Sequence, residues 1–147
     1  MITLKEITED NWIECLSLKE EENARKFISS NLFSIAQAQF YPKAISKAIY
    51  NDDTMVGYTL YGEDEDEHDM FHIDRLMISL DFRNQGFASE TLRLIIQEAS
   101  ENGYGKLAAS VHPENEKMKN LMNNFGFEFN GEYDDDEMVF RKTTDAK

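Results

Sequence analysis

Residues 83–88, with the sequence RNQGFA, decide the fold because they separate an apolar strand from a long amphipathic helix. The strand is predicted at 71–79, and the helix that follows carries one apolar stripe that includes Leu92, Ile95 and Ala99. A glycine-containing loop that enters a helix exposes unpaired backbone N–H groups at the positive end of the helix dipole. The stretch therefore predicts an anion site suited to a pyrophosphate. It matches neither the P-loop nor the dinucleotide-binding motif.

The length and the charge limit the classes of protein that are compatible with the sequence. The chain has 147 residues, of which 41% are hydrophobic, so we expect a single domain spanning 1–147 with a real core. It carries 29 acidic and 15 basic residues, a formal net charge of −14. Nucleic acids and anionic membranes require clustered positive charge, so neither is an expected partner. A cationic partner is compatible with this charge, but the charge can also serve only solubility.

Cysteine content and hydropathy limit the expected location of the protein and the sites that it can form. Cys15 is the single cysteine, which excludes an internal disulfide and a cysteine-rich zinc site. No apolar run reaches the length of a membrane span, and the first residues lack a signal-peptide pattern. We therefore expect a soluble cytoplasmic protein without a bound metal.

Hydrophobic periodicity gives the element order β-α-α-β-β-β-α-β-α-β-β, which is a mixed α/β domain. The segment 44–50 is compatible with a helix by its spacing. The turn signal at 51–54 instead favours a hairpin with the strand that follows. In the strand 71–79, alternation places His72, Asp74, Leu76 and Ile78 on one face if no bulge intervenes.

The loop at 83–88 resembles the coenzyme A loop of the GNAT superfamily of N-acetyltransferases, which has the form Q/R-x-x-G-x-G/A. Asn115, the helix after it and the sequence Phe125-Gly126-Phe127 resemble a second region of that family. Within the superfamily, the segments 56–62, 73–78 and 127–132 look like those of bacterial spermine/spermidine (diamine) acetyltransferases. The resemblance implies the GNAT fold, which has a mixed central sheet of about six to seven strands and four helices.

The resemblance also implies acetyl-CoA as cosubstrate and a polyamine such as spermine or spermidine as the acceptor. The backbone of one strand would pair with the pantetheine arm, N–H groups of the loop would hold the pyrophosphate, and the residue before the next helix would contact the cosubstrate. The cofactor-binding residues implied in this way are Leu76, Met77, Ile78, Arg83, Asn84, Gln85, Gly86, Phe87, Ala88, Ser89 and Asn115. The resemblance is compatible with a homodimer.

Amine acetylation requires a group that accepts a proton, because a primary amine with a pKa of about 10.4 is protonated at neutral pH. Asp74 lies nine residues before Arg83, where the resemblance to polyamine acetyltransferases places an acidic residue. We therefore expect Asp74 to be the base or the ammonium anchor, with His72 as the second candidate. Asp74 can instead pair with Arg75 or cap a neighbouring segment, and a lone histidine near a strand is commonly structural.

Met122 departs from the family pattern, which places a tyrosine here to protonate the departing thiol. Methionine cannot donate a proton. The substrate ammonium, water, or a hydroxyl such as that of Tyr61 or Tyr133 can take over this role. Alternatively, the chain is a catalytically weak domain that binds acetyl-CoA or polyamine, or it acetylates another cationic amine, such as a protein N-terminus or an aminoglycoside. Two acidic runs, within 63–69 and 132–137, can attract a cation or form solvated loops.

Overall fold

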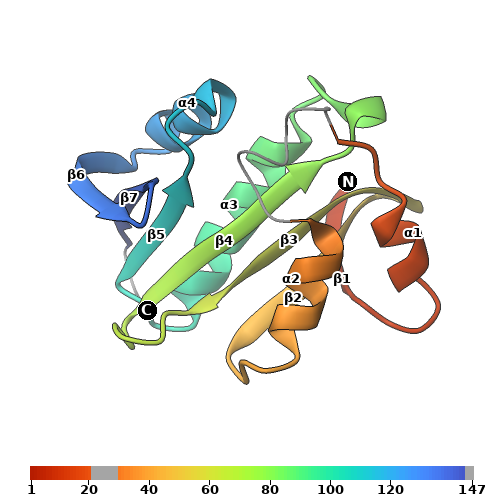
Figure 1. The fold of residues 1–147 in the computed structure, drawn as a ribbon, viewed down its shortest axis with the longest axis horizontal. Helices are drawn as coiled ribbons and strands as arrows, with labels where there is room; N and C mark the ends of the chain where they lie inside the picture. The colour runs from red at the N-terminus through yellow and green to blue at the C-terminus, as the bar shows by residue number, and fades with distance from the viewer. Residues whose placement is uncertain (21–29, 145–147) are drawn as a thin grey trace.

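The computed structural model describes residues 1–20 and 30–144 (Figure 1). Seven strands and four α-helices are formed within these ranges, together with one short 3-10 helix (η2). Their order and bounds are β1 (Ile2–Glu6), α1 (Trp12–Leu16), α2 (Asn31–Ala38), β2 (Ala44–Asn51), β3 (Thr54–Glu63), β4 (Met70–Ile78), η2 (Leu80–Phe82), α3 (Phe87–Glu101), β5 (Lys106–Val111), α4 (Glu116–Asn124), β6 (Glu128–Asp134) and β7 (Glu137–Thr143). The expected element order is confirmed.

The strands form one mixed sheet with the order β1-β2-β3-β4-β5-β7-β6. Each pair of neighbours is antiparallel except β4 and β5, which run parallel. The segment 44–51 pairs with β3, with Asp52 at a positive φ of 54° in the turn, so the hairpin prediction is confirmed. Asp and Asn tolerate the left-handed backbone region better than most residues, so Asp52 suits this turn position.

Two apolar layers cover the two faces of the sheet. On one face, α3 contributes Leu92, Ile95 and Ala99 to the largest core cluster, and α4 adds Met122. On the other face, Cys15 of α1 packs with Tyr58 and Met77, and α2 covers the edge of this second cluster. Figure 1 shows α1 and α2 in front of the sheet and α3 behind it. The helices on opposite faces bury a sheet whose central strands are apolar on both sides.

A bulge in β4 alters the predicted distribution of side chains. Arg75 pairs with Leu60 and Ile73 pairs with Tyr61, so Asp74 is the extra residue between them. Because a bulge turns two successive side chains toward one face, the alternation is interrupted there. Leu76 and Ile78 belong to the core cluster under α3, whereas Asp74 and His72 line a pocket on the other face. The shared face was predicted only for a strand without a bulge, and the bulge places Leu76 and Ile78 on the opposite face from His72 and Asp74.

Within the described ranges, no helix is both long and apolar enough to cross a membrane.

Candidate active site

The two parallel strands at the centre of the sheet separate part of the way along their length. The pairing of β4 with β5 ends at Ile73 and Ala109. Beyond this point β5 continues to pair with β7, and β4 continues to pair with β3. The facing edges of β4 and β5 are therefore unpaired with each other from Asp74 and Ser110 onward. This separation opens a V-shaped gap in the middle of the sheet.

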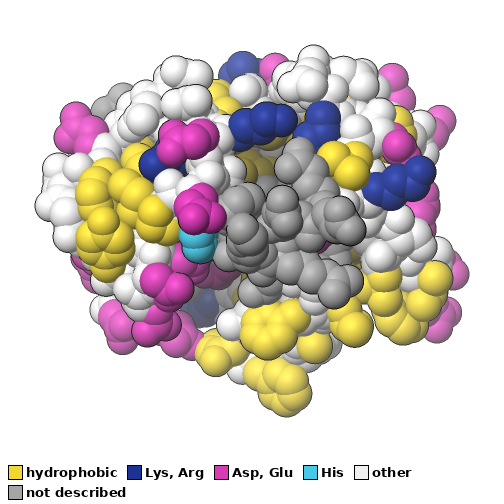
Figure 2. Space-filling view, turned by 45° about the horizontal axis from the view of Figure 1, so that its top comes forward, with side chains coloured by type: hydrophobic (Ala, Val, Ile, Leu, Met, Phe, Trp, Pro, Cys, Tyr) yellow, Lys and Arg dark blue, Asp and Glu magenta, His cyan; other side chains and the backbone are white. Residues whose placement is uncertain are grey.

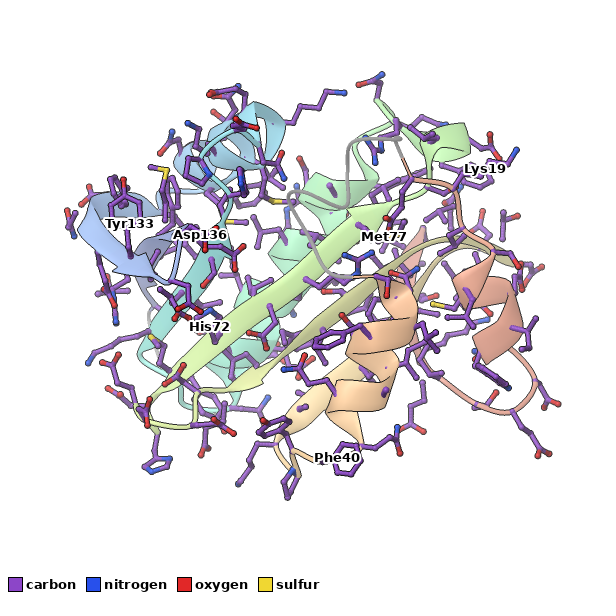
Figure 3. The ribbon with its side chains drawn as sticks, viewed as in Figure 1. Lys19, Phe40, His72, Met77, Tyr133 and Asp136 are labelled. Atoms are coloured by element: carbon purple, nitrogen blue, oxygen red, sulfur yellow. The ribbon has the colours of Figure 1, made fainter. Side chains whose placement is uncertain are left out.

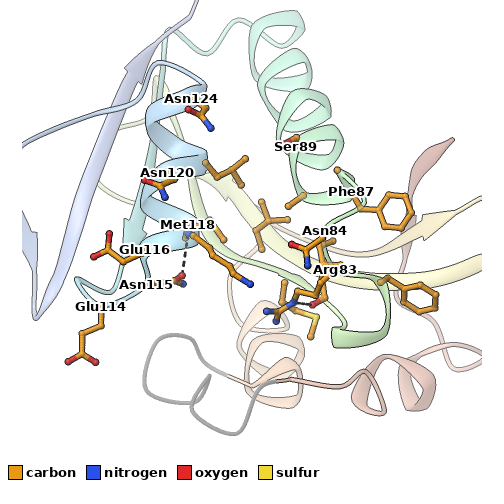
Figure 4. Close-up of a pocket in the computed structure, with 18 residues that line it drawn as sticks. Arg83, Asn84, Phe87, Ser89, Glu114, Asn115, Glu116, Met118, Asn120 and Asn124 are labelled. Carbon is orange, nitrogen blue, oxygen red and sulfur yellow. Dashed lines mark hydrogen bonds between the residues drawn. The ribbon is translucent and has the colours of Figure 1, made fainter.

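A cleft of about 610 Å³ lies at the open end of the V, between β4, the start of α3 and α4 (Figure 4). The unpaired edge of β4 offers backbone N–H and C=O groups to an extended ligand, as a sheet edge does to an added strand. Ten of the eleven residues implied for cosubstrate binding line this cleft. They are Leu76, Met77, Ile78, Arg83, Asn84, Gly86, Phe87, Ala88, Ser89 and Asn115. Gln85 is exposed and lies outside the lining.

The start of α3 has the local geometry of an anion site. Gly86 is the N-cap residue, with a left-handed φ of 81°, and it provides no side chain to cap the helix. A Cβ built at Gly86 would meet no atom within 4 Å, so the backbone there faces open space. Asn84 also adopts a positive φ, of 63°, and the Arg83 Nε donates to the Ile78 carbonyl at 2.9 Å. The loop thus presents the first N–H groups of a 15-residue helix to the cleft.

Asn115 joins the cleft to the start of α4. Its Oδ1 accepts a hydrogen bond from the Met118 backbone N–H at 3.2 Å and caps the helix. The cap fixes the side chain, and the amide nitrogen remains able to donate toward the cleft. Asn115 also lines a small gap of about 20 Å³ between the separating strands, together with Asp74, Ser110 and Met122.

A second pocket, of about 500 Å³, lies on the α2 face of the sheet and is strongly acidic. The β3–β4 loop, the bulge of β4 and the β6–β7 hairpin all contribute carboxylates to its lining. These are Glu63, Asp64, Glu65, Asp66, Asp74 and Asp134. Figure 2 shows acidic side chains gathered beside a histidine on this side of the molecule. Parts of both predicted acidic runs therefore meet in one pocket.

His72 is held at the base of the acidic pocket between a carboxylate and a hydroxyl (Figure 3). Its Nδ1 lies 3.2 Å from Asp64 Oδ1, and its Nε2 lies 2.9 Å from Ser110 Oγ. Its side chain is 16% exposed. The ring is thus fixed by polar contacts on both nitrogens.

Asp74 lies where the gap and the acidic pocket meet, since it lines both. Its Oδ1 is 3.9 Å from His72 Nε2. Desolvation by the surrounding protein raises the pKa of Asp74 above its ordinary value, and the charges of Asp64, Glu65 and Asp134 add to this effect, while His72 opposes it. The side chain keeps 55% of its surface exposed, so a substrate can reach the carboxylate. A carboxylate with a raised pKa is a better proton acceptor than an ordinary one.

The alternative pairing of Asp74 with Arg75 is not formed. The Arg75 guanidinium turns to Asn31, where Nε donates to Oδ1 at 2.8 Å, and to Glu20. This buried group links Asn31 of α2 and Glu20 to β4. The Asp74 carboxylate therefore faces the gap and the acidic pocket without an arginine partner from Arg75.

Met122 and the two tyrosines whose hydroxyls the sequence suggested as replacement donors lie in different places. Met122 is 1% exposed and lines the gap, where a methionine offers no proton. The Tyr61 hydroxyl donates to Glu98 of α3 at 2.7 Å, and burial together with this carboxylate raises its pKa, so it faces away from the cleft. Tyr133 is 56% exposed on the edge strand β6 and packs edge-on against Phe129. Neither tyrosine is placed to replace the missing donor.

Sequence reasoning did not identify Ser110. The only signal was a single hydroxyl residue in the apolar strand segment 107–111. Ser110 matters because the pairing of β5 with β4 ends at Ala109, one residue before it. No local sequence pattern encodes where this pairing ends. Among the described residues, no group of three or more His, Cys, Asp or Glu is placed to hold a metal ion.

The model of the Acetyltransferase (GNAT) family matches residues 4–127, and the chain belongs to that family. It is thus a GNAT N-acetyltransferase, and the family expectation from the sequence is confirmed.

Known relatives agree on the family and differ in their substrates. The spermine/spermidine N(1)-acetyltransferase of Bacillus subtilis (strain 168) is 27% identical over 141 residues, covering 90% of this chain and 91% of that protein. The ribosomal L7/L12 alpha-N-protein acetyltransferase RimL, solved with coenzyme A, superposes with a TM-score of 0.80 at 14% identity, covering 99% of this chain and 96% of that one. The PaiA N-acetyltransferase of Thermoplasma acidophilum, also solved with coenzyme A, gives a TM-score of 0.73 at 13% identity over 97% and 99% of the two chains. The structural matches support the fold alone.

Proposed function

We propose that this protein transfers the acetyl group of acetyl-CoA to a primary amine of a polyamine such as spermine or spermidine. The observation that carries the proposal is the acidic pocket, which holds six carboxylates and meets the coenzyme side of the sheet at Asp74. A curated relative named as a spermine/spermidine acetyltransferase supports the same substrate class.

The residues of the cleft fit acetyl-CoA. The first N–H groups of α3 suit the pyrophosphate, and Gly86 leaves the space for it. The unpaired edge of β4 at Leu76, Met77 and Ile78 suits the amide-bearing pantetheine arm. When bound, acetyl-CoA supplies a thioester carbonyl that an amine can attack.

The acidic pocket suits an acceptor with several positive charges. Carboxylates on three separate segments surround its mouth, so a chain of ammonium groups can contact more than one of them at once. Like charges gathered in a cleft attract oppositely charged substrates and raise the rate of their encounter. Asp74 then accepts the proton of the amine at the end nearest the gap, which leaves a neutral nitrogen able to attack.

The substrate class can be tested by incubating the protein with acetyl-CoA and a panel of amines and measuring the release of free coenzyme A. Spermine and spermidine should support release, with acetylated product identified by mass spectrometry. Hexylamine is the matched control because it has a primary amine but only one charge, and it should react far more slowly. Equal rates with hexylamine and spermine, or no reaction with any polyamine, would refute the polyamine assignment.

Met122 favours a second candidate function, that of a domain that binds acetyl-CoA but transfers the acetyl group weakly. Its buried side chain occupies the gap where the family pattern places a tyrosine. The variant Met122→Tyr separates the two functions. A large gain in turnover without a change in coenzyme A affinity would favour the weak-transfer function, whereas an unchanged or reduced turnover would favour a complete enzyme.

A further inference from the structure

Three polar side chains from distant parts of the chain form a continuous hydrogen-bonded row. Asp64 lies in the β3–β4 loop, His72 on β4 and Ser110 on β5. The distances are 3.2 Å from Asp64 Oδ1 to His72 Nδ1 and 2.9 Å from His72 Nε2 to Ser110 Oγ. The row joins the base of the acidic pocket to the gap between the separating strands.

The carboxylate at one end fixes the direction of the hydrogen bonds. Asp64 Oδ2 accepts from the backbone N–H groups of Asp66 and Glu67, both at 3.0 Å. Although partial burial opposes the effect, these hydrogen bonds and His72 lower the pKa of Asp64, so it is an anion that only accepts. His72 Nδ1 must therefore carry a proton, and in the neutral ring Nε2 accepts from the Ser110 hydroxyl.

Ser110 occupies the point where the strands separate. The last paired residues of β4 and β5 are Ile73 and Ala109, so Asp74 and Ser110 are the first residues beyond the pairing. Ser110 lines the gap together with Leu76, Asn115 and Met118, which also line the coenzyme cleft. The gap is thus bordered by the cleft on one side and by the acidic pocket on the other.

We propose that Ser110 donates the proton that the coenzyme A sulfur needs on departure, with His72 and Asp64 as positioning residues that restore this proton. The inference rests on the acetyl transfer of the proposed function but not on which amine is the acceptor. It supplies the proton donor that Met122 cannot be.

The transfer balances as follows. A bond forms between the amine nitrogen and the acetyl carbon, and the carbon–sulfur bond breaks with its electron pair on sulfur. Before the attack, the protonated amine gives one proton to Asp74, which passes it over 3.9 Å to His72 Nε2 by a side-chain rotation or one water molecule, so that the ring becomes an imidazolium. The Ser110 O–H proton then passes to the sulfur, and Ser110 Oγ takes the Nε2 proton of His72. The second proton that the nitrogen loses after the attack goes to Asp74 and from there to solvent.

The histidine is required because serine by itself is too weak an acid. An alkyl hydroxyl is nearly as weak an acid as water, whereas a thiol, with a pKa of about 8.5, is a much stronger acid. A serine that donated alone would be left as an alkoxide, which is strongly unfavourable. Simultaneous donation from Nε2 removes this cost, and Asp64 stabilises the imidazolium that carries the proton.

The proposal predicts that the effect of removing the hydroxyl depends on the leaving group. Ser110→Ala should lower kcat with acetyl-CoA by about 10²-fold, as expected for the loss of a general acid. With an acetyl thioester of an acidic aryl thiol, whose anion needs no proton, the same variant should lose less than about threefold relative to wild type. Ser110→Thr keeps a hydroxyl and should recover most of the activity.

Ser46→Ala is the matched control, because it removes a half-buried hydroxyl of the same sheet that bonds to Tyr58 at 2.7 Å away from the site. Its kcat should be unchanged with both donors. An equal loss for Ser110→Ala with both thioesters would overturn the proposal, and so would full activity of this variant with acetyl-CoA. Calorimetry should show unchanged coenzyme A affinity for Ser110→Ala.

A readout that does not depend on activity is the protonation of His72, measured by ¹⁵N NMR of the imidazole nitrogens. In the wild-type protein the proton should reside on Nδ1, and in Asp64→Asn this preference should be lost. A proton on Nε2 in the wild type would overturn the proposal. If the wild-type protein acetylates no polyamine, the proposed substrate fails, while this measurement still decides whether the row exists.

Discussion

The two sides of the central gap recognise their ligands by different means. On the coenzyme side, the cleft offers mainly backbone groups, from the unpaired edge of β4 and the start of α3. On the acceptor side, the acidic pocket offers charged side chains from three segments that are distant in the sequence. A backbone site depends on the path of the chain and on one glycine, whereas a side-chain site depends on which remote residues meet. Substitutions should therefore affect the two sides in separable ways.

The largest effect is expected at Asp74, where the two sides meet. Asp74→Asn preserves the shape but cannot accept a proton, so kcat should fall by about 10²–10⁴-fold. Steady-state kinetics with varied acetyl-CoA should show little change in its KM, since the backbone of the cleft is untouched. Asp136→Asn is the control, because this exposed acid lies in the β6–β7 turn outside the pocket lining. A comparable loss in both variants would contradict the role of Asp74 as the base.

The next largest effect is expected on the coenzyme side. Gly86→Ala places a Cβ in the open space before α3 at a φ of 81°, which costs roughly 1–2 kcal/mol of stability and crowds the anion site. Coenzyme A affinity, measured by calorimetry, should fall by about tenfold, which corresponds to 1.4 kcal/mol.

Gly105→Ala is the control for Gly86→Ala, because its Cβ also meets no atom within 4 Å but the residue lies outside the cleft. Coenzyme A affinity should be unchanged in this variant. Unchanged affinity in Gly86→Ala would show that the start of α3 does not hold the pyrophosphate.

A smaller effect is expected from the acidic pocket alone. The double variant Glu65→Gln with Asp66→Asn removes two charges from the mouth of the pocket and should raise the KM for spermine by about three- to tenfold at low salt. The difference should shrink as salt rises, because screening at 0.1 M limits such attraction to about 10 Å. Acetyl-CoA binding should not change. A double variant of Asp135 and Asp136, which lie outside the pocket lining, should leave the KM for spermine unchanged.

The smallest effect is on stability and has the opposite sign to the effect on activity. The pKa of Asp74 is raised in the folded protein, so the stability of the fold is lost progressively as the pH rises from about 3.8 to above the raised pKa. Asp74→Asn should therefore raise Tm at pH 7 relative to wild type. The gain should vanish below a pH of about 3.8, where the carboxyl is protonated in both states. A lower Tm of this variant at pH 7 would contradict the crowding of charge around Asp74.

The coenzyme side could be predicted almost entirely from local sequence. The resemblance carried by the loop 83–88 and Asn115 implied eleven binding residues, of which the structure brings ten to one cleft, and only Gln85 lies elsewhere. This succeeds because a glycine at the start of a helix determines where the N–H groups point. The implied contacts with the cosubstrate stay predictions.

The acceptor side could be predicted only in part. Asp74 and His72 were singled out, but the bulge that separates them from Leu76 and Ile78 was not foreseen. The hydroxyls of Tyr61 and Tyr133 were candidates on sequence grounds, and packing against Glu98 and Phe129 turns both away from the gap. Whether a side chain points into a site depends on the residues that contact it in space, and these contacts are not encoded locally in the sequence.

The sequence by itself determined the order of the elements and the loop that suits a pyrophosphate, because these follow from periodicity and from the conformational freedom of Gly86, and the resemblance of its motifs to the GNAT superfamily determined the family. Only the tertiary structure decided that parts of the two acidic runs share a pocket and that Ser110 meets His72. The physical reason is the geometry of the sheet. The pairing of β4 with β5 ends at Ile73 and Ala109, and this long-range event sets which side chains face the gap.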